Sequence, residues 1–133
     1  MEQTGTKEYR IADNIVKILE GNIVHIIASG DQDGETAADH YLLHKELRKT
    51  IHGKINYLID LNRTGKSSPQ ARQVWKKLSE SEFTEKIALW GIHPVARILA
   101  TFVMGVTHKT DMRFFTSMEE AAEWLGIPPE SVK

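Results

Sequence analysis

The stretch Tyr57–Arg72, YLIDLNRTGKSSPQAR, decides how the rest of the chain is organised. It begins as a short apolar strand from Tyr57 to Asp60, continues as a polar loop, and reaches Pro69 at the first turn of a helix. Proline is tolerated there because its missing N–H would have no intrahelical partner, and a serine before it accepts from the amides of the first turn. The stretch therefore predicts a strand-to-helix connection, which is where open α/β sheets usually bind ligands.

Downstream of this stretch, strand-like and helix-like segments alternate. The expected order is strand Ile55–Asp60, helix 68–78, strand 86–90, helix 94–106, strand 113–115 and helix 117–125. The last helix opens with a capping box at Ser117–Glu120 and ends at Gly126. Strands that alternate with helices imply right-handed crossovers, so these strands are expected to be parallel.

Upstream, the pattern predicts a β-hairpin. Ile15–Leu19 and Ile23–Ala28 are rich in β-branched residues and are separated by the turn-forming triplet Glu20-Gly21-Asn22. Tyr9–Ala12 is expected to be an edge strand. The glycine-rich segment Gly30–Gly34 is expected to be a loop, followed by a helix that ends near residue 49.

These elements predict a single α/β domain over residues 1–133, with residues 1–7 disordered. We expect a mixed, mostly parallel sheet of about four or five strands, with the hairpin at its N-terminal end. The four helices are expected to pack largely on one face. A chain of 133 residues is an ordinary length for one domain.

The composition limits the classes of function. The chain has no cysteine, which excludes disulfides, thiolate metal sites and thiol catalysis. Its 17 basic and 18 acidic residues give a net charge of −1, without the basic field of a nucleic-acid-binding protein, so no nucleic-acid partner is expected. The sequence contains no apolar run long enough to span a bilayer and begins without a signal-like segment, so we expect a cytoplasmic protein without a transmembrane segment.

The polar loop has the composition of an anion-binding site. Lys66, Ser67 and Ser68 lie just before a helix N-terminus, and Arg72 follows one turn later. Unpaired amides and the helix dipole favour an anion or a phosphorylated side chain at such a place. A Walker A motif is excluded because the position five residues before Gly65 is Asp60. The alternative is that the serines only cap the helix within an exposed basic loop.

The helix over residues 94–106 is apolar around most of its circumference. His93 and Arg97 begin a polar stripe, and they are candidates for binding a partner or ligand beside the loop. The apolar width exceeds what an ordinary surface helix needs. It indicates a deeply buried helix, an apolar ligand or a homodimer, with the interface candidates Ile98, Phe102, Val103 and Met104.

Two patterns suggest metal or catalytic chemistry but are incomplete. His40 and His44 lie one helical turn apart, yet no third ligand accompanies them, so they are interpreted as boundary histidines and no metal or other cofactor is expected. A serine hydrolase uses a serine, a histidine and an aspartate, and the candidates for these roles are Ser67 or Ser68, His93 and Asp60. Because the sequence has no G-x-S-x-G elbow, an enzyme is disfavoured.

Three segments in order resemble a known family: YLIDLNRTGKSSPQAR, KIALWGIHPVARILATFVMG and MRFFTSMEEAAEWL. They are similar to the STAS domains of anti-sigma-factor antagonists, and more closely to the SpoIIAA-like branch, which is related in shape to CRAL-TRIO lipid-binding domains. The resemblance implies that Ser67 and Ser68 lie near the serine that a partner kinase phosphorylates in such antagonists. Lys66 stands where those domains have an acidic residue, and Pro69 where they have glycine.

The sequence therefore predicts a non-catalytic binding or regulatory module of the STAS type. It is expected to recognise a partner protein or a small, partly apolar or anionic ligand. A carrier of lipids or other apolar ligands is the alternative, and a small serine hydrolase is less favoured.

Overall fold

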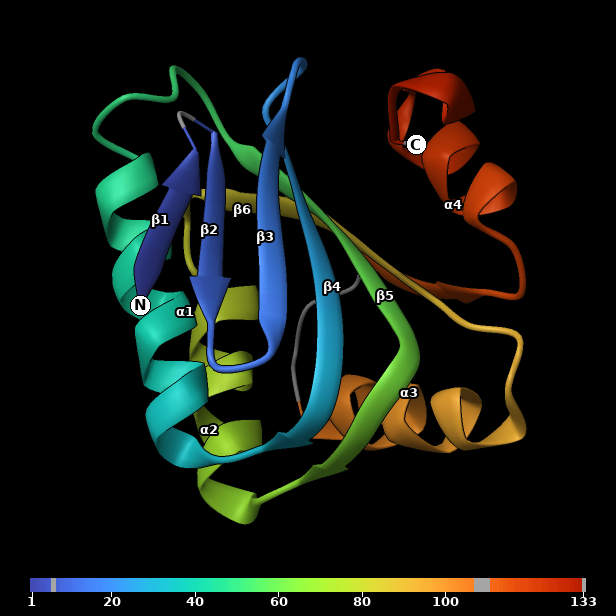
Figure 1. Cartoon of the computed structure of the whole chain (residues 1–133). Coiled ribbons are helices and arrows are strands. Elements are labelled where there is room, and N and C mark those ends of the chain that lie inside the picture. Colours follow the sequence, from blue (N-terminus) through green and yellow to red (C-terminus); the bar gives the residue numbers. More distant parts are fainter. Residues whose placement is uncertain (6, 107–110, 133) are drawn as a thin grey trace.

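Two long parallel strands, β4 (Ile23–Gln32) and β5 (Ile55–Ser67), form the centre of the fold (Figure 1). They are seen in a computed structural model, which describes residues 1–5, 7–106 and 111–132. The first halves of both strands are buried and rich in Ile, Leu and Val, which is typical of strands covered on both faces. These two strands therefore form the buried middle of the sheet.

The sheet is mixed, as expected, but it has seven strands in the described residues rather than four or five. The strands lie in sequence order; the pairs from β1 to β4 are antiparallel and those from β4 to β7 are parallel. The remaining strands are β1 (Glu2–Gly5), β2 (Glu8–Ile11), β3 (Asn14–Leu19), β6 (Thr84–Trp90) and β7 (Met112–Phe115).

The first strand differs from the expected disorder over residues 1–7. Glu2–Gly5 are exposed, and no apolar pattern marks them as a strand. They are ordered because their backbone pairs with β2, so Tyr9 no longer lies on the edge of the sheet. Backbone pairing of this kind depends little on side-chain identity, which explains why the composition of the segment did not reveal it.

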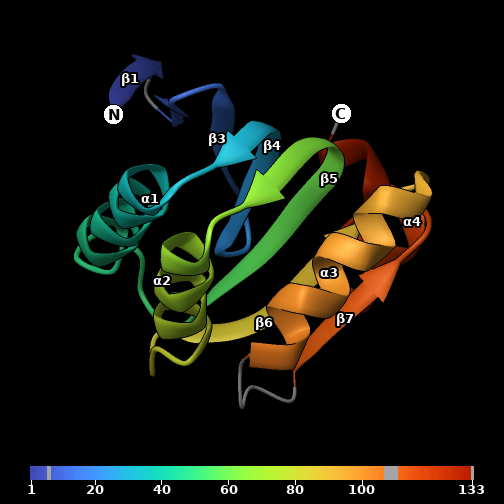
Figure 2. The same ribbon diagram turned by 90° about the horizontal axis from the view of Figure 1, so that it is seen from below.

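Three helices cover one face of the sheet, and the fourth covers the other (Figures 1 and 2). Because consecutive strands lie side by side and crossovers are right-handed, α1 (Gly34–Leu47), α2 (Pro69–Ser79) and α3 (Pro94–Val106) share a face. After the last strand, α4 (Met118–Leu125) and the short helix η1 (Pro129–Val132) pack on the opposite face. The expected one-sided packing thus holds for three of the four helices.

Alternation along the central strands supplies two apolar layers. Ile26, Tyr57 and Leu89 belong to the larger core beneath α1, α2 and α3. Ile23, Leu58 and Ala88, from the same three strands, belong to the smaller core beneath α4. Side chains of successive strand residues point to opposite faces, so both layers come from the same three strands.

The predicted helix caps are confirmed. Ser68 precedes α2, and its Oγ accepts a hydrogen bond of 3.0 Å from the amide of Ala71. Ser117 caps α4 in the same way, accepting from the amide of Glu120 at 3.2 Å. Gly126 ends α4 in the left-handed conformation, with φ 80°, which glycine adopts without steric cost. Local sequence therefore places these helix ends accurately.

The polar segment after Asp60 was predicted as a loop, and this was wrong. β5 continues to Ser67, and β4 continues through the expected Gly30–Gly34 loop as far as Gln32. The two strand ends pair with each other, and the Asp31 carboxylate accepts from the Lys66 amide at 2.9 Å. A Cβ at Gly65 would collide with that carboxylate, so this close approach requires glycine.

Candidate functional site

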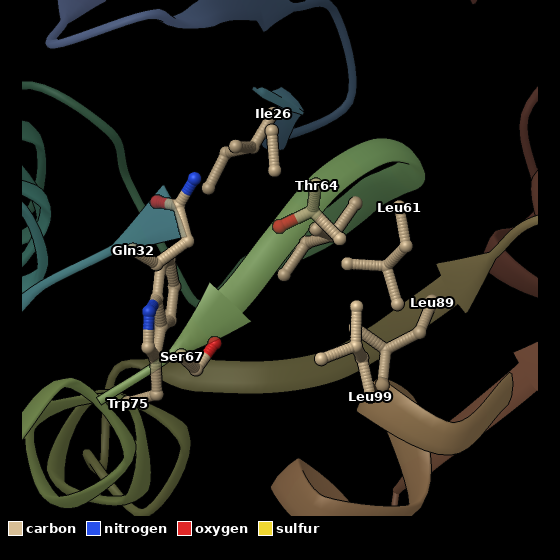
Figure 3. Close-up of a pocket in the computed structure, with 10 residues that line it drawn as sticks. Ile26, Gln32, Leu61, Thr64, Ser67, Trp75, Leu89 and Leu99 are labelled. Atoms are coloured by element: carbon tan, nitrogen blue, oxygen red, sulfur yellow. The ribbon is translucent and has the colours of Figure 1, made fainter. Parts of the chain in front are cut away.

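A mostly apolar pocket lies between the centre of the sheet and the helices α2 and α3 (Figure 3). Its volume is about 50 Å³. Strands β4, β5 and β6 form its floor, and α2 and α3 contribute Trp75 and Leu99 to its walls. The full lining is Ile26, Ala28, Gln32, Ile59, Leu61, Thr64, Ser67, Trp75, Leu89 and Leu99. Only three of these side chains are polar.

Irregular pairing between β4 and β5 aims two hydroxyl side chains into this pocket. The register shifts between Ile27 and Ser29, and again between Gly30 and Gln32, so that β5 has an extra residue at each shift. Each extra residue reverses which side chains of β5 face the helices. Thr64 and Ser67 consequently line the same pocket as Leu61, although simple alternation would not place all three on one face.

Figure 3 shows the hydroxyl groups of Thr64 and Ser67 directed toward the space enclosed by Trp75 and Leu99. Among the described residues, neither side chain makes a hydrogen bond. The two hydroxyls are therefore available to a molecule that enters the pocket.

A buried amide pair closes the polar end of the pocket. Asn14 Nδ2 donates to Gln32 Oε1 at 2.7 Å, and Gln32 Nε2 donates back to Asn14 Oδ1 at 3.0 Å. Gln32 Nε2 also lies 3.0 Å from the carbonyl oxygen of Gly30, and the Ser29 amide donates to Asn14 Oδ1 at 2.8 Å. These bonds fix the Gln32 side chain in the pocket wall.

His40 extends this network behind the pocket. Its Nε2 lies 2.8 Å from Asn14 Nδ2, which is a donor, so Nε2 is the accepting nitrogen of a neutral imidazole. Burial lowers the pKa of His40 to about 4, which keeps the ring neutral near pH 7. The ring packs against Trp75 with its centroid 5.1 Å away. A polar group thus positions an aromatic wall of the pocket.

His44 makes a second buried contact between α1 and the sheet. Its Nδ1 lies 2.6 Å from the Tyr57 hydroxyl, and its Nε2 lies 3.0 Å from Ser81 Oγ. Burial lowers the pKa of His44 to about 4, and nearby Arg48 adds to the effect. The sequence analysis placed His40 and His44 at the boundary between core and surface. In the structure both are buried, with only 3% and 1% of their surface exposed. Their contacts inside the domain explain the spacing that resembled a metal-binding pair.

The structure separates the predicted loop residues into different environments. Ser67 lines the pocket, and its carbonyl oxygen accepts from Arg72 Nη1 at 3.1 Å. Ser68 is the N-cap of α2. Lys66 is exposed, and its amide bonds to Asp31. Their roles in binding or phosphorylation stay predictions.

His93 and Arg97 lie at the start of α3 and are exposed. The Arg97 guanidinium lies over the Phe114 ring of β7, 5.1 Å from its centroid. Asp60 lines a second cavity, which lies on the opposite side of the sheet from the pocket that contains Ser67. Asp60 Oδ1 accepts from the Asn62 amide at 2.9 Å. The arrangement required of a Ser-His-Asp hydrolase is therefore absent from these described residues.

The predicted interface residues on α3 divide between surface and core. Ile98 is 55% exposed and lies about one turn of α3 from the exposed Val95. Met104 is half-buried and packs against the larger core. The side chains of Phe102 and Val103 lie outside the described part of the chain. The homodimer therefore stays a prediction, now centred on Ile98.

We expect the domain to sediment as a dimer if this face of α3 is an interface. Ile98→Lys should then weaken the dimer about thirtyfold, because a charge replaces a central apolar contact worth about 2 kcal/mol. The control is Leu42→Lys, which changes an equally exposed leucine on α1. Sedimentation velocity over a range of concentrations measures both. A monomeric wild-type protein would contradict this prediction.

Several residues of the pocket and of the amide network beside it were not identified from sequence. Asn14, Gln32 and Thr64 are polar residues within or beside strands, and Trp75 lies on a helix whose apolar face is narrow. Asn14 is the first residue of its strand yet fully buried. A buried amide side chain in a strand indicates a polar network. A single sequence does not show which amide side chains are buried, so this signal could not be used.

Comparison with known proteins agrees with this architecture. The SpoIIAA-like family matches residues 23–126, from the start of β4 to the cap of α4. The chain belongs to the SpoIIAA-like family. This confirms the resemblance seen in the sequence and makes the domain a binding or regulatory module of the STAS type, a class that is in general non-enzymatic.

The fold of this SpoIIAA-like domain is also similar to a solved structure. An uncharacterized protein from Shewanella loihica PV-4 with a SpoIIAA-like fold superposes with a TM-score of 0.60 at 18% sequence identity. The similarity covers 94% of this chain and 95% of that one. No curated protein gives a significant match. Across the part of the chain described here, every helix is too short or too polar to cross a membrane.

Proposed function

We propose that this SpoIIAA-like domain is a non-catalytic module that binds a small, partly apolar ligand in the pocket between β4, β5, α2 and α3. The observation that carries the proposal is the lining, in which seven apolar side chains surround the hydroxyls of Thr64 and Ser67. Ligand pockets typically combine an apolar wall with a few placed polar groups. The apolar part of the ligand would contact Ile59, Leu89 and Leu99.

The polar part of the ligand would lie against Thr64 and Ser67. Both hydroxyls can donate to a carboxylate or accept from a hydroxyl group. Arg72 lies beside Ser67 and exposed Lys66 precedes it, and these two cations outnumber the Asp31 carboxylate that accepts from the Lys66 amide. The charge favours an acidic headgroup over a basic one. A short fatty acid has this combination of an apolar chain and an anionic head.

The small volume of this pocket also determines how a ligand would enter it. A pocket of about 50 Å³ is far smaller than the roughly 300–1,000 Å³ of typical ligand sites. A ligand would therefore enter only when α2 and α3 move apart, carrying Trp75 and Leu99 with them. Such a movement would change the surface formed by the two helices, which is how a binding module can report its ligand to a partner protein.

Native mass spectrometry of the purified protein, followed by titration with decanoate, tests this function. We expect decanoate to bind one per domain. Ala28→Leu should weaken binding at least tenfold, because added methyl groups occupy the small cavity. Ala38→Leu, on the exposed side of α1, is the matched control and should bind like the wild type. Unchanged binding by Ala28→Leu would contradict the location of the site.

The polar contact is tested by removing one hydroxyl. Thr64→Val conserves shape and should weaken decanoate binding several-fold, since the lost hydrogen bond is worth about 1 kcal/mol. Thr116→Val, an exposed threonine before α4, should have no effect. Equal losses of decanoate affinity in Thr64→Val and Thr116→Val would contradict a direct hydrogen bond between Thr64 and the ligand.

A switch controlled by phosphorylation is the second candidate. Ser67 and Ser68 lie at the N-terminus of α2, where a phosphate would meet amides and the positive end of the helix dipole. The denatured spectrum from the same mass measurement distinguishes the two functions. A covalent phosphate survives denaturation and supports the switch, whereas a bound ligand is lost.

A further inference from the structure

A second cavity lies on the opposite face of the sheet, where α4 begins. It has a volume of about 340 Å³ and lies over the early part of β4, the middle of β5 and the end of β6. His25, Asp60 and Trp90 come from these three strands, and Glu119 comes from the first turn of α4. Because the sheet separates it from the pocket of Figure 3, this cavity is independent of the function proposed above.

Two buried ring nitrogens at this cavity have no hydrogen-bond partner among the described residues: Nδ1 of His25 and Nε1 of Trp90. His25 as a whole is only 5% exposed. Leaving a buried donor or acceptor unpaired costs about 1–3 kcal/mol, and such groups are rare in folded proteins. Both rings line the same cavity. Rotation of the imidazole about Cβ–Cγ exchanges Nδ1 with Cδ2, so it changes which edge of the ring meets a ligand.

The charge at the cavity is negative. Asp60 and Glu119 both line it, and its lining among the described residues includes no lysine or arginine. Lys17, which pairs with His25 across β3 and β4, adds one positive charge beside the imidazole. Asp60 Oδ1 accepts from the Asn62 amide and from Asn62 Nδ2, at 2.9 and 2.7 Å, which holds the carboxylate in place. Burial lowers the pKa of His25 to about 4, so the imidazole adds no positive charge near pH 7. Two carboxylates against the single charge of Lys17 leave a net negative charge, which favours a cation over an anion.

The remaining walls combine aromatic and apolar side chains with the hydroxyl residues Thr116 and Ser117. Trp90 contributes an indole, and Ile92 and Met118 also line the cavity. An organic ammonium group is attracted both by carboxylates and by an aromatic face. The unpartnered indole N–H adds a donor, which suits an oxygen on the same ligand.

We propose that this cavity binds a small organic amine that also carries a hydroxyl or carbonyl oxygen. Its ammonium group donates to the Asp60 carboxylate, with Glu119 supplying further negative charge. Its oxygen accepts from the Trp90 indole N–H, and His25 pairs with a remaining polar hydrogen. The carbon skeleton lies against Ile92 and Met118.

Tyramine is a suitable probe because it combines an ammonium group, an aromatic ring and a hydroxyl group. The indole N–H signals of Trp75, Trp90 and Trp124 can be followed by NMR during titration of the 15N-labelled protein, with Trp90→Phe assigning the Trp90 signal. We expect the Trp90 signal to shift and saturate at millimolar tyramine. The signal of Trp75, which lies in the other pocket, should stay in place.

Matched ligands test the charge. 4-Ethylphenol lacks the ammonium group, and 3-(4-hydroxyphenyl)propionate replaces it with a carboxylate. Both should bind at least tenfold more weakly than tyramine. If the anionic compound shifts the Trp90 signal as strongly as tyramine does, or if tyramine causes no shift up to about 10 mM, the proposal is wrong.

Matched variants test the residues. Asp60→Asn removes the charge and keeps an oxygen that accepts from Asn62, so the fold should persist while tyramine binding weakens about tenfold. Glu119→Gln should weaken it severalfold. The control is Glu123→Gln, an exposed residue one turn further along α4, which should bind like the wild type. Unchanged binding by both Asp60→Asn and Glu119→Gln overturns the assignment.

Discussion

Lowering the pH from 7 to 5 is expected to reduce the free energy of unfolding by about 5 kcal/mol, because three buried histidines must stay neutral in the folded state. Burial lowers the pKa values of His25, His40 and His44 from 6.5 to about 4. The unfolded chain therefore binds protons first as the pH falls. The stabilisation is complete above pH 6.5 and is lost progressively as the pH approaches 4.

The magnitude follows from the same values. Between pH 7 and pH 5 each histidine contributes a loss of about 1.8 kcal/mol, and below pH 4 about 3 kcal/mol. A domain of this size has a total stability of about 5–15 kcal/mol, so acid unfolding near pH 4 to 5 is expected. Urea titrations followed by circular dichroism at several pH values between 4.5 and 7.5 measure the effect.

Single variants identify the histidines that cause the pH dependence of stability. His40→Gln should remove about one third of the pH dependence, and His44→Gln a similar share, while each also lowers stability at pH 7 by breaking a buried hydrogen bond. His52→Gln changes an exposed histidine and should keep the full pH dependence. A wild-type unfolding free energy that is constant between pH 7 and 5 would contradict the prediction.

The second large effect is expected for Asn14→Ala. Asn14 is fully buried and connects Gln32, His40 and the Ser29 amide. Its loss leaves these three polar groups buried with a missing partner, which should cost about 3–5 kcal/mol of unfolding free energy. Because Gln32 lines the apolar pocket, the same variant should also weaken decanoate binding.

The control for this variant is Gln73→Ala on the exposed side of α2, which should change stability by less than about 0.5 kcal/mol. In the double variant Asn14→Ala with Gln32→Ala, the losses should be less than additive, because each residue is the other's partner. Full additivity in urea unfolding would show that the amide pair is not a coupled unit.

Local sequence was sufficient for most helices and for the parallel half of the sheet. Pro69 after Ser68 marks the start of α2, and Ser117 and Gly126 mark the ends of α4. These signals act through hydrogen bonds within a few residues, so they can be identified without knowledge of distant contacts. The family resemblance rested on the same segments and was confirmed.

Long-range pairing decided the features that were missed. The segment from Leu61 to Ser67 is polar, and it is a strand only because β4 pairs with it as far as Gln32. The two register shifts then turn Thr64 and Ser67 toward the helices. Burial of His40 likewise depends on β3 bringing Asn14 beside α1.

The sequence by itself determined the α/β class, the order of most elements and the helix caps, because periodicity and capping are properties of neighbouring residues. Only the tertiary structure decided that α4 covers the opposite face, which creates the cavity of His25, Asp60 and Trp90. It also decided that Ser67 faces the apolar pocket while Asp60 faces away from it. Which side chains share a cavity depends on strand register and helix placement, and these are set by contacts between residues far apart in the chain.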